Sequence, residues 1–325
     1  MGRIFCAGVA TALALTACSG PDADDAAAGG TGLEKSEITV GALLVPDAAP
    51  LHIALERGFF AAEGLTVRHE PIQGAAFALP RLQAGTMDVA MLNYITVFAA
   101  QEKKVGRFKL IADGYQGAPN TFVLMVPGDS KVKTPADLKG KKIAVATLNS
   151  IGTLTTEAAL KGAGADVKRD GIQYTEIPLP NMLEAMKNHQ VDAYWMTEPF
   201  ITASQKMLGA RKLLDTMSGA TADLPVSGWG VTEEFAARHP KTVAAFQRAI
   251  VKAQRIAAED RRAVVQILPK YTQIDAETAA VIALGTYPTT LNATRLQRVA
   301  DLMLEHGYLR EKFEVQPLLH TPPSG

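Results

Sequence analysis

The chain has 325 residues, with 33 Lys and Arg against 33 Asp and Glu, so its formal net charge at neutral pH is zero. This balance argues against a nucleic-acid partner, because such proteins carry strongly basic faces. The length allows two domains. The two cysteines, Cys6 and Cys18, both stand near the N-terminus. The body of the chain therefore has no disulfide, no cysteine nucleophile and no cysteine-containing metal site.

The N-terminus has the pattern of an export signal. Arg3 supplies a positive charge, residues 4–15 form an apolar stretch, and small residues precede Cys18. The stretch is too short for a permanent membrane-spanning helix, which needs about 20 residues. Small residues followed by cysteine resemble the lipobox of bacterial lipoproteins, whose signal peptidase leaves a lipid-bearing N-terminal cysteine. We expect residues 1–17 to be a lipoprotein signal peptide and Cys18 to be lipidated. The alternative is an ordinary secretory cut.

The segment after the cysteine differs in composition from the body of the protein. Residues 18–37 are acidic, rich in Gly and Ala, and low in large apolar side chains. Such a segment cannot bury enough apolar surface to fold, so we expect a disordered tether. The body begins at Ile38, and no later apolar run is long enough to span a membrane.

Strand-like and helix-like stretches alternate through the first two-thirds of the chain. In its first part we expect strands at 37–45, 65–70, 87–92 and 107–113, and helices at 50–64, 74–85 and 93–104. The pattern then restarts, with strands at 120–130, 141–146, 171–179, 191–196, 211–216 and 226–232, and helices at 135–140, 149–164 and 182–190. This alternation predicts βαβ units and mostly parallel sheets.

The last part of the chain is helical. Expected helices cover residues 233–260, 263–271, 276–285 and 294–307. No sequence period of 20 to 50 residues repeats, which argues against a solenoid. Two α/β lobes with a helical tail account for the whole pattern.

Four segments of the chain resemble a known family. They are HIALERGFFAAEGLTV, LQAGTMDVAML, VPGDSKVKTPADLKGKKIAV and VDAYWMTEPF. In this order, behind a lipobox, they resemble the periplasmic substrate-binding proteins of the nitrate/sulfonate/taurine class of ABC importers. Binders of thiamine pyrimidine precursors are close relatives of that class. The similarity extends from about Glu37 to about Glu234.

The resemblance implies an α/β, two-lobed periplasmic binding protein fold of type II, the hinged Venus flytrap, with a helical C-terminal tail. Its second lobe is inserted into the first, with crossings expected near residues 121–127 and 227–232. The implied boundaries are listed in chain order: 38–122 for the first part of lobe 1, 123–228 for lobe 2, and 229–325 for the return crossover, the rest of lobe 1 and the tail. The ligand would lie between the lobes.

Four junctions between a strand and the following helix supply candidate ligand contacts. In open α/β sheets ligands bind beyond the carboxyl ends of the strands, where helix starts offer free N–H groups to anions. The first three junctions contribute Asp47, the pair Gln73 and Gly74, and the pair Asn93 and Tyr94. Gly74 allows close backbone approach, and Tyr94 offers a ring to stack on or a hydroxyl. The alternatives for these two are a plain turn and core packing.

The fourth junction is the best candidate for an anionic group. It follows the expected strand 141–146, and Asn149, Ser150 and Thr153 add polar side chains to the N–H groups of the helix start. An ordinary helix cap is the alternative, because Asn and Ser are common there. Many relatives have Gly-Ser at this place, and the Asn-Ser of this chain departs from that pattern.

Glu198 stands among aromatic residues in the stretch YWMTEPF. A carboxylate in apolar surroundings is costly unless something pairs with it. It follows the expected strand 191–196, so we expect it to face the cleft and to bind a ligand ammonium or ring N–H. Trp195 or Trp229 would add cation–π attraction. The alternative is a structural role, with Glu198 bonded to backbone at the hinge.

The other features of the sequence indicate no chemistry. The six histidines show no metal-ligand spacing, and the chain has no HExxH, Walker, G-x-S-x-G or G-x-G-x-x-G motif. We therefore expect no metal, no cofactor and no enzymatic activity. An enzyme on the same scaffold is an alternative class, since fold does not dictate function. A lipoprotein that senses or scaffolds without transport is another.

These observations lead to one functional expectation. The protein is an extracytoplasmic solute-binding receptor of an ABC importer, held on the outer face of the cell membrane by lipidated Cys18. Its partners are a small solute, a permease and its ATPase, and we expect a monomer. Glu198 with an anion-binding helix start indicates a taurine-like or other sulfonate zwitterion. An aminopyrimidine-like ring is the alternative, while nitrate alone offers nothing to the carboxylate.

Overall fold

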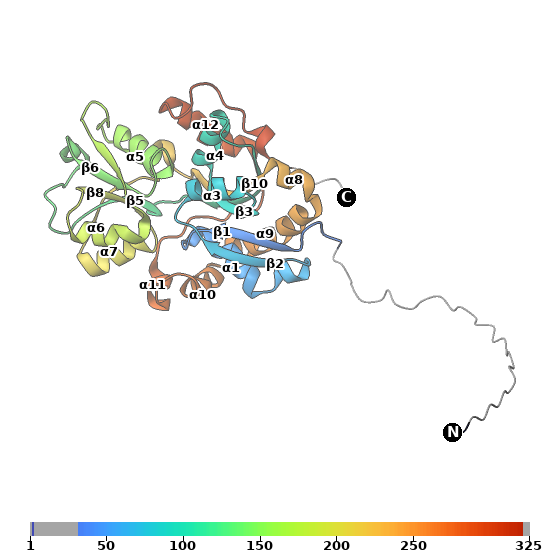
Figure 1. The fold of residues 1–325 in the computed structure, drawn as a ribbon. Coiled ribbons are helices and arrows are strands. Elements are labelled where there is room, and N and C mark those ends of the chain that lie inside the picture. Colours follow the sequence, from blue (N-terminus) through green and yellow to red (C-terminus); the bar gives the residue numbers. More distant parts are fainter. Residues whose placement is uncertain (1, 3–31, 321–325) are drawn as a thin grey trace. The chain divides into compact units, whose positions relative to one another are not determined.

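A computed structural model describes Gly2 and residues 32–320 of the chain (Figure 1). Cys18 and most of the expected signal peptide and tether lie outside the described residues, so their assignments stay predictions. Two five-stranded sheets with helices on both faces make up the described part. The α/β class and the helical C-terminal region expected from the sequence are confirmed.

The first sheet has the strand order β2-β1-β3-β10-β4. Its strands are β1 (Glu37–Ala42), β2 (Thr66–Pro71), β3 (Val89–Asn93), β4 (Phe108–Gln116) and β10 (Pro225–Thr232). β3 is buried almost throughout because it lies inside the sheet with helices on both faces. This sheet and the helices around it form the first lobe.

The second sheet has the order β7-β6-β8-β5-β9. Its strands are β5 (Phe122–Val126), β6 (Lys142–Val145), β7 (Gln173–Glu176), β8 (Ala193–Thr197) and β9 (Arg211–Asp215). β5 and β8 are buried along their whole length. This sheet and its helices form the second lobe.

The chain passes between the two sheets at residues 117–121 and again at 216–224. Both crossings lie a few residues before the expected ones, because β5 and β10 are full members of their sheets. Residues 225–228, expected in the second lobe, thus belong to the first. The sheets are also mixed rather than mostly parallel. β10 runs antiparallel to β3 and β4, and β5 runs antiparallel to β8 and β9, because each of these strands enters its sheet from a crossing.

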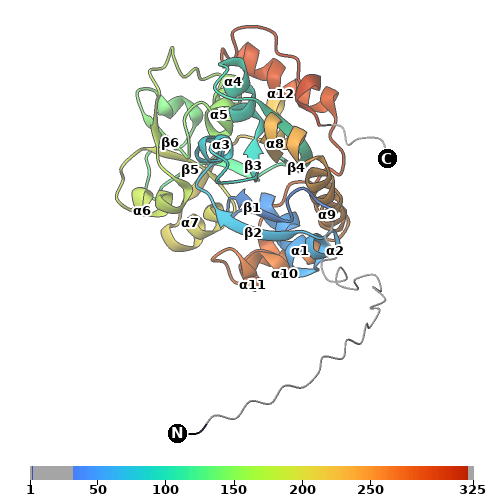
Figure 2. The same ribbon diagram turned by 45° about the vertical axis from the view of Figure 1, so that its right-hand side comes forward.

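The helices cover both faces of each sheet (Figures 1 and 2). Those of the second lobe are α5 (Ile151–Gly162), α6 (Met182–Lys187) and α7 (Phe200–Leu208). Those of the first lobe are α1 (Ala49–Glu56), α2 (Phe59–Ala62), α3 (Ala75–Gln83), α4 (Tyr94–Glu102), α8 (Glu233–Arg238), α9 (Pro240–Glu259), α10 (Arg261–Ile267), α11 (Ala276–Val281) and α12 (Ala293–Glu305). In the first lobe α1 packs on α9, and α4 packs on α12.

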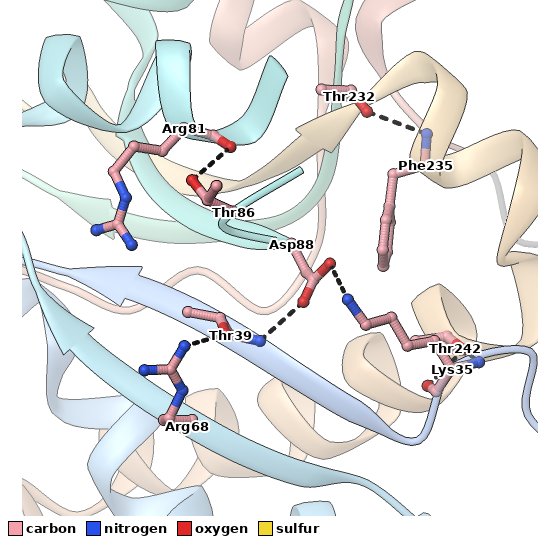
Figure 3. Close-up of polar contacts among 9 residues, drawn as sticks. All are labelled: Lys35, Thr39, Arg68, Arg81, Thr86, Asp88, Thr232, Phe235 and Thr242. Carbon is pink, nitrogen blue, oxygen red and sulfur yellow. Dashed lines mark hydrogen bonds and ion pairs between the residues drawn. The ribbon is translucent and has the colours of Figure 1, made fainter. Parts of the chain in front are cut away.

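The end of the expected tether is fastened to the first lobe. The Glu34 carboxylate accepts hydrogen bonds from the amides of Lys241 (3.1 Å) and Thr242 (3.0 Å) at the start of α9, which has no side-chain cap of its own. Lys35 Nζ lies 2.7 Å from Asp88 Oδ1, and Asp88 Oδ2 accepts from the Thr39 amide at 2.9 Å (Figure 3). Glu34 and Lys35 are therefore part of the folded body although they precede Ile38, because the free amides of α9 need an acceptor.

A buried carboxylate on the edge strand β4 holds α4 and α12 against the first sheet. Asp113 Oδ1 accepts from the Tyr94 hydroxyl at 2.7 Å and from the Gly114 amide at 2.9 Å. Arg295, on α12, forms an ion pair with Asp113 Oδ2. The Asp113 side chain is fully buried, so the arginine supplies the charge that its carboxylate requires.

We expect Arg295→Met to destabilise the protein by about 3 kcal/mol, because it leaves a buried carboxylate without a counter-charge. Arg298→Met, one turn along the same helix at an exposed position, should change stability by less than about 0.5 kcal/mol. Urea denaturation of both variants and the parent measures the difference. Equal effects of the two substitutions would contradict the assignment of Asp113 as a buried charge centre.

Candidate functional site

A cavity lies between the two lobes at the carboxyl ends of several strands. The space in it that is open to the centre of a water molecule is about 70 Å³, enough for a few waters or one small solute, since one water needs about 10–15 Å³. Its polar lining residues are Asp47, Gln73, Asn93, Thr147, Ser150, Thr197 and Ser227. Its larger apolar and aromatic lining residues are Leu43, Val45, Met91, Phe122, Ile151, Leu179, Trp195 and Val226.

Asp47 is the only carboxylate among the described residues that line this cavity. It follows β1 in a short 3-10 helix (Pro46–Ala48) and is only 5% exposed. Its Oδ2 accepts a hydrogen bond from the Ser227 hydroxyl at 2.9 Å, while no described group bonds its Oδ1. Burial raises the pKa of Asp47 from 3.8 to about 7. A buried acceptor without a donor is costly, so this oxygen is ready to take one from a ligand.

The second lobe contributes the start of α5. Ser150, Ile151 and Gly152 line the cavity, and the first amides of a helix have no partner within it. Ser150 and Thr153 form a capping box, in which the Ser150 amide donates to Thr153 Oγ1 at 3.0 Å. Thr153 is buried and is used in this cap, and it does not line the cavity. The amides of Ile151 and Gly152 thus remain for an electronegative group.

Trp195 forms an aromatic wall of the cavity together with Phe122. Their rings stack with centroids 5.3 Å apart and an interplanar angle of 15°. The indole approaches α5 closely, because a Cβ at Gly152 would lie 3.1 Å from two of its ring atoms. Trp195 Nε1 is buried and has no hydrogen-bond partner among the described residues. This wall is therefore apolar apart from one buried N–H group, which has no partner among the described residues.

The two lobes contact each other beside the cavity. Thr96 Oγ1 on α4 lies 3.3 Å from Ser150 Oγ at the start of α5. Gly74 approaches Thr147 of the second lobe so closely that a Cβ would lie 3.1 Å from Thr147 Oγ1. The glycine thus permits close approach of the other lobe at this point. Residues of both lobes therefore line one cavity, and the lobes contact each other beside it.

The cavity contains no full positive charge from the protein. Among the described residues that line it, none is Lys, Arg or His. The part of the chain that the structure describes contains no group of three or more His, Cys, Asp or Glu side chains that could hold a metal ion. In the same part of the chain, no helix is long and apolar enough to cross a membrane.

Two of the residues expected in the site lie in the core of the first lobe. Tyr94 is fully buried, and its hydroxyl donates a hydrogen bond to Asp113 inside the lobe. Trp229 is also fully buried, with its ring 5.7 Å from Phe246 in an edge-to-face contact. For Tyr94 the geometry matches core packing, the alternative that the sequence left open.

Asn149 stands at the fourth junction without lining the cavity. It adopts a positive φ of 51°, which asparagine tolerates better than most residues and which turns the chain into α5. The other expected residues at the junctions, Gln73, Gly74, Asn93 and Ser150, do line the cavity. Asn93 also caps α4, because its Oδ1 accepts from the Thr96 amide at 2.9 Å.

Glu198 lines a separate cavity of about 430 Å³ on the hinge side of the second lobe. Its carboxylate accepts from the Thr202 amide (3.1 Å) and hydroxyl (2.9 Å) in α7, and from the backbone of Ala283 in the first lobe. Burial raises the pKa of Glu198, and these hydrogen bonds oppose the rise. The contacts match the structural alternative of the sequence analysis, in which Glu198 bonds backbone at the hinge.

The lining residues that were absent from the expected set include Phe122, Thr147, Thr197 and Ser227. Thr147 lies two residues after β6, and Thr197 is the last residue of β8. The rule of strand carboxyl ends, applied to every strand, would therefore have found both. Ser227 lies inside β10, and only the pairing of β10 with β3 brings it to Asp47.

Comparisons with known proteins identify the family of the chain. Residues 31–269 match the model of the NMT1-like family. The chain belongs to the NMT1-like family. A taurine-binding periplasmic protein of Escherichia coli (strain K12) is 26% identical over 214 residues, which are 64% of this chain and 63% of that protein. The match thus covers less than two thirds of that relative.

Solved structures establish the fold of this NMT1-like protein. An alkanesulfonate-binding protein from Xanthomonas axonopodis pv. citri, bound to MOPS, is similar with a TM-score of 0.72 and 19% identity, over 88% of this chain and 98% of that one. A Candida albicans protein described as having the generic periplasmic binding protein fold has a TM-score of 0.70 and 13% identity, over 88% and 96%. The periplasmic binding protein fold expected from the sequence is confirmed.

The pKa of Asp47 makes the stability of the ligand-free protein depend on pH. Between pH 3.8 and about 7 the folded protein keeps a proton that the unfolded chain has released, so stability falls as the pH rises through this window. Asp47→Asn removes the free-energy cost of ionising this buried carboxyl. At pH 8 we expect this variant to be roughly 2 to 4 kcal/mol more stable than the parent, and nearly equal to it at pH 4.

Urea denaturation from pH 4 to pH 8 measures this difference. Asp301→Asn, at an exposed position on α12, is the control and should follow the pH profile of the parent. A constant offset between Asp47→Asn and the parent at all pH values would rule out a titrating buried carboxyl.

Proposed function

We propose that this protein is the extracytoplasmic solute-binding receptor of an ABC importer, closing over a small organic solute between its two lobes. The observation that carries the proposal is the inter-lobe cavity, whose lining residues include Asp47 and Trp195. Asp47 Oδ1 is a buried acceptor and Trp195 Nε1 is a buried donor, each without a partner among the described residues. Family membership and the likeness to solute-binding proteins support it.

Closure supplies the mechanism of a receptor. Solute contacts both lobes only when they are together, so its binding energy shifts the hinge toward the closed form. The permease then distinguishes closed from open receptor, and no bond in the solute needs to change. This account makes the protein a binder rather than an enzyme.

A small zwitterion, such as taurine or another aminosulfonate, is the first candidate ligand. Its ammonium group would donate to Asp47 Oδ1 and hold that carboxyl in its ionised form. Its anionic group would lie at the start of α5 and accept from Ser150, the first helix amides and Trp195 Nε1. Asp47 thus takes the part that the sequence analysis gave to Glu198.

An aminopyrimidine-like ring is the second candidate, favoured by the aromatic wall. The stacked pair Phe122 and Trp195 offers a flat face, and an exocyclic amine would donate to Asp47 while a ring nitrogen accepts from Trp195 Nε1. A plain anion such as nitrate would bury its charge beside the Asp47 carboxyl with no basic side chain in the lining, which is unfavourable.

The cellular setting follows from the same proposal. The receptor would be exported, cut before Cys18 and anchored by lipid to the outer face of the cell membrane. It would act as a monomer that delivers solute to a permease driven by its ATPase. Mass spectrometry of the mature protein, with and without Cys18→Ala, tests the anchor: the parent should carry diacylglycerol, and the variant should not.

A thermal-shift screen of residues 32–325 tests the ligand class. The panel holds taurine, alkanesulfonates without an amine, nitrate, aminopyrimidines and simple amines. A solute at 100 times its Kd stabilises by about 2.7 kcal/mol, which should raise the melting temperature by roughly 5 °C or more. We expect shifts from compounds that carry an amine or ring N–H. Shifts from plain anions alone would contradict the part given to Asp47.

Substitutions then locate the site. With the compound that gives the largest shift, we expect Asp47→Asn and Trp195→Phe each to raise Kd at least tenfold, because each removes one buried polar partner. Glu198→Gln, outside the cavity, should raise Kd by less than Asp47→Asn does. Isothermal titration gives these values. A larger rise in Kd from Glu198→Gln than from Asp47→Asn would show that Glu198, and not Asp47, is the carboxylate that binds the ligand.

A further inference from the structure

One segment of the first lobe contacts both the loop that carries Asp47 and the second lobe. It consists of residues 271–287, here called the α11 segment because α11 lies within it. In Figures 1 and 2 α11 lies beside α7 of the second lobe and next to α10 of the first. None of its residues lines the inter-lobe cavity, so its contacts serve the site indirectly.

The two ends of the α11 segment hold the Asp47 loop. The Tyr271 hydroxyl donates to the backbone carbonyl of Val45, and the Tyr287 hydroxyl donates to that of Pro46, each at 3.0 Å. These carbonyls belong to the two residues immediately before Asp47. Tyr271 also stacks on His52 of α1, with ring centroids 3.8 Å apart. The direction of the Asp47 side chain is therefore supported by two tyrosines from more than 220 residues away in sequence.

The middle of the α11 segment holds the second lobe. The Ala283 backbone bonds the buried Glu198 carboxylate, which also accepts from Thr202 at the start of α7. Lys206 Nζ donates to Thr278 Oγ1 at 2.7 Å. The lysine is exposed, so that contact contributes little. The second lobe thus contacts the α11 segment at two points, through the buried Glu198 carboxylate and through the exposed Lys206.

We propose that Tyr271 and Tyr287 are positioning residues for the solute-binding carboxylate, and that the α11 segment couples their hold on the Asp47 loop to the contact of Glu198 with Ala283. Movement of the second lobe away from α11 would break the Glu198 contact and loosen the segment, and with it the loop. This inference rests on the proposed receptor function. In this inference Glu198 has a coupling role, because its contact with Ala283 links the position of the second lobe to the Asp47 loop.

Hydrogen exchange of the Ala48 amide tests the coupling without any ligand. This amide donates to the Val45 carbonyl at 3.0 Å, the same oxygen that Tyr271 bonds. In the ligand-free protein, we expect the double variant Tyr271→Phe with Tyr287→Phe to speed its exchange about tenfold. Tyr174→Phe is the matched control, because the buried Tyr174 hydroxyl has no partner among the described residues, and we expect no change at Ala48.

Removal of the hinge contact is the second part of the test. We expect Glu198→Ala to speed exchange at Ala48 at least threefold, although the two residues lie in different lobes. Lys206→Met, at an exposed position, provides a milder break of the same interface should Glu198→Ala fold poorly, and its effect should have the same sign. Faster exchange confined to α7, with Ala48 unchanged in both variants, would overturn the coupling.

A binding measurement separates this inference from the proposed function. With taurine as the probe, the tyrosine double variant should raise Kd about tenfold, mainly through faster dissociation, while Tyr174→Phe leaves it unchanged. If taurine fails to bind the parent protein, the proposed zwitterion class fails, and the exchange data on the ligand-free protein still decide the coupling. Unchanged exchange and unchanged Kd in the double variant would overturn the positioning role.

Discussion

The arrangement around the cavity depends on the free-energy cost of burying a carboxylate that has one unpaired oxygen. Asp47 receives one hydrogen bond, from Ser227, and its other oxygen has no partner among the described residues. A protein retains such a group when the fold around it supplies the missing stability and a ligand supplies the missing bond. The first sheet, the crossing into β10 and the α11 segment all contribute to holding this one side chain. In the receptor that we propose, the unpaired Trp195 donor of the other lobe completes the site when the lobes close.

Local sequence patterns were sufficient for most of the fold. Period-2 apolar runs and helix starts placed nearly every strand and helix, because in a two-lobed α/β chain each element follows the previous one at short range. The lobe crossings were displaced by a few residues, and the sheets proved mixed. Both differences have one cause. β5 and β10 look like other strands in sequence, and their direction depends on which sheet edge they reach after the crossing.

The candidate site was predictable in part. The rule of strand carboxyl ends found Asp47, Ser150 and the junctions between them, since it depends only on local order. It does not say toward which side a residue turns. Tyr94 faces the core because Asp113, on another strand, needs its hydroxyl. Glu198 turns to the hinge because Ala283, distant in sequence, meets it there. Such pairings arise from tertiary packing, and no pattern within one element reveals them. The aromatic residues around Glu198 correctly indicated that this acid is buried. The neighbours of Asp47, a proline and an alanine, indicated burial less clearly.

Proton release on solute binding tests the central claim most directly. Titration calorimetry at pH 7, repeated in buffers of different ionisation enthalpy, counts the protons exchanged when the strongest solute of the panel binds. The pKa of Asp47 is about 7 in the ligand-free protein, so an N–H donor that fixes the ionised carboxylate should release about half a proton. Asp47→Asn should abolish this release. Binding without proton release in the parent, or the same release in Asp47→Asn, would show that the solute does not pair with this carboxylate.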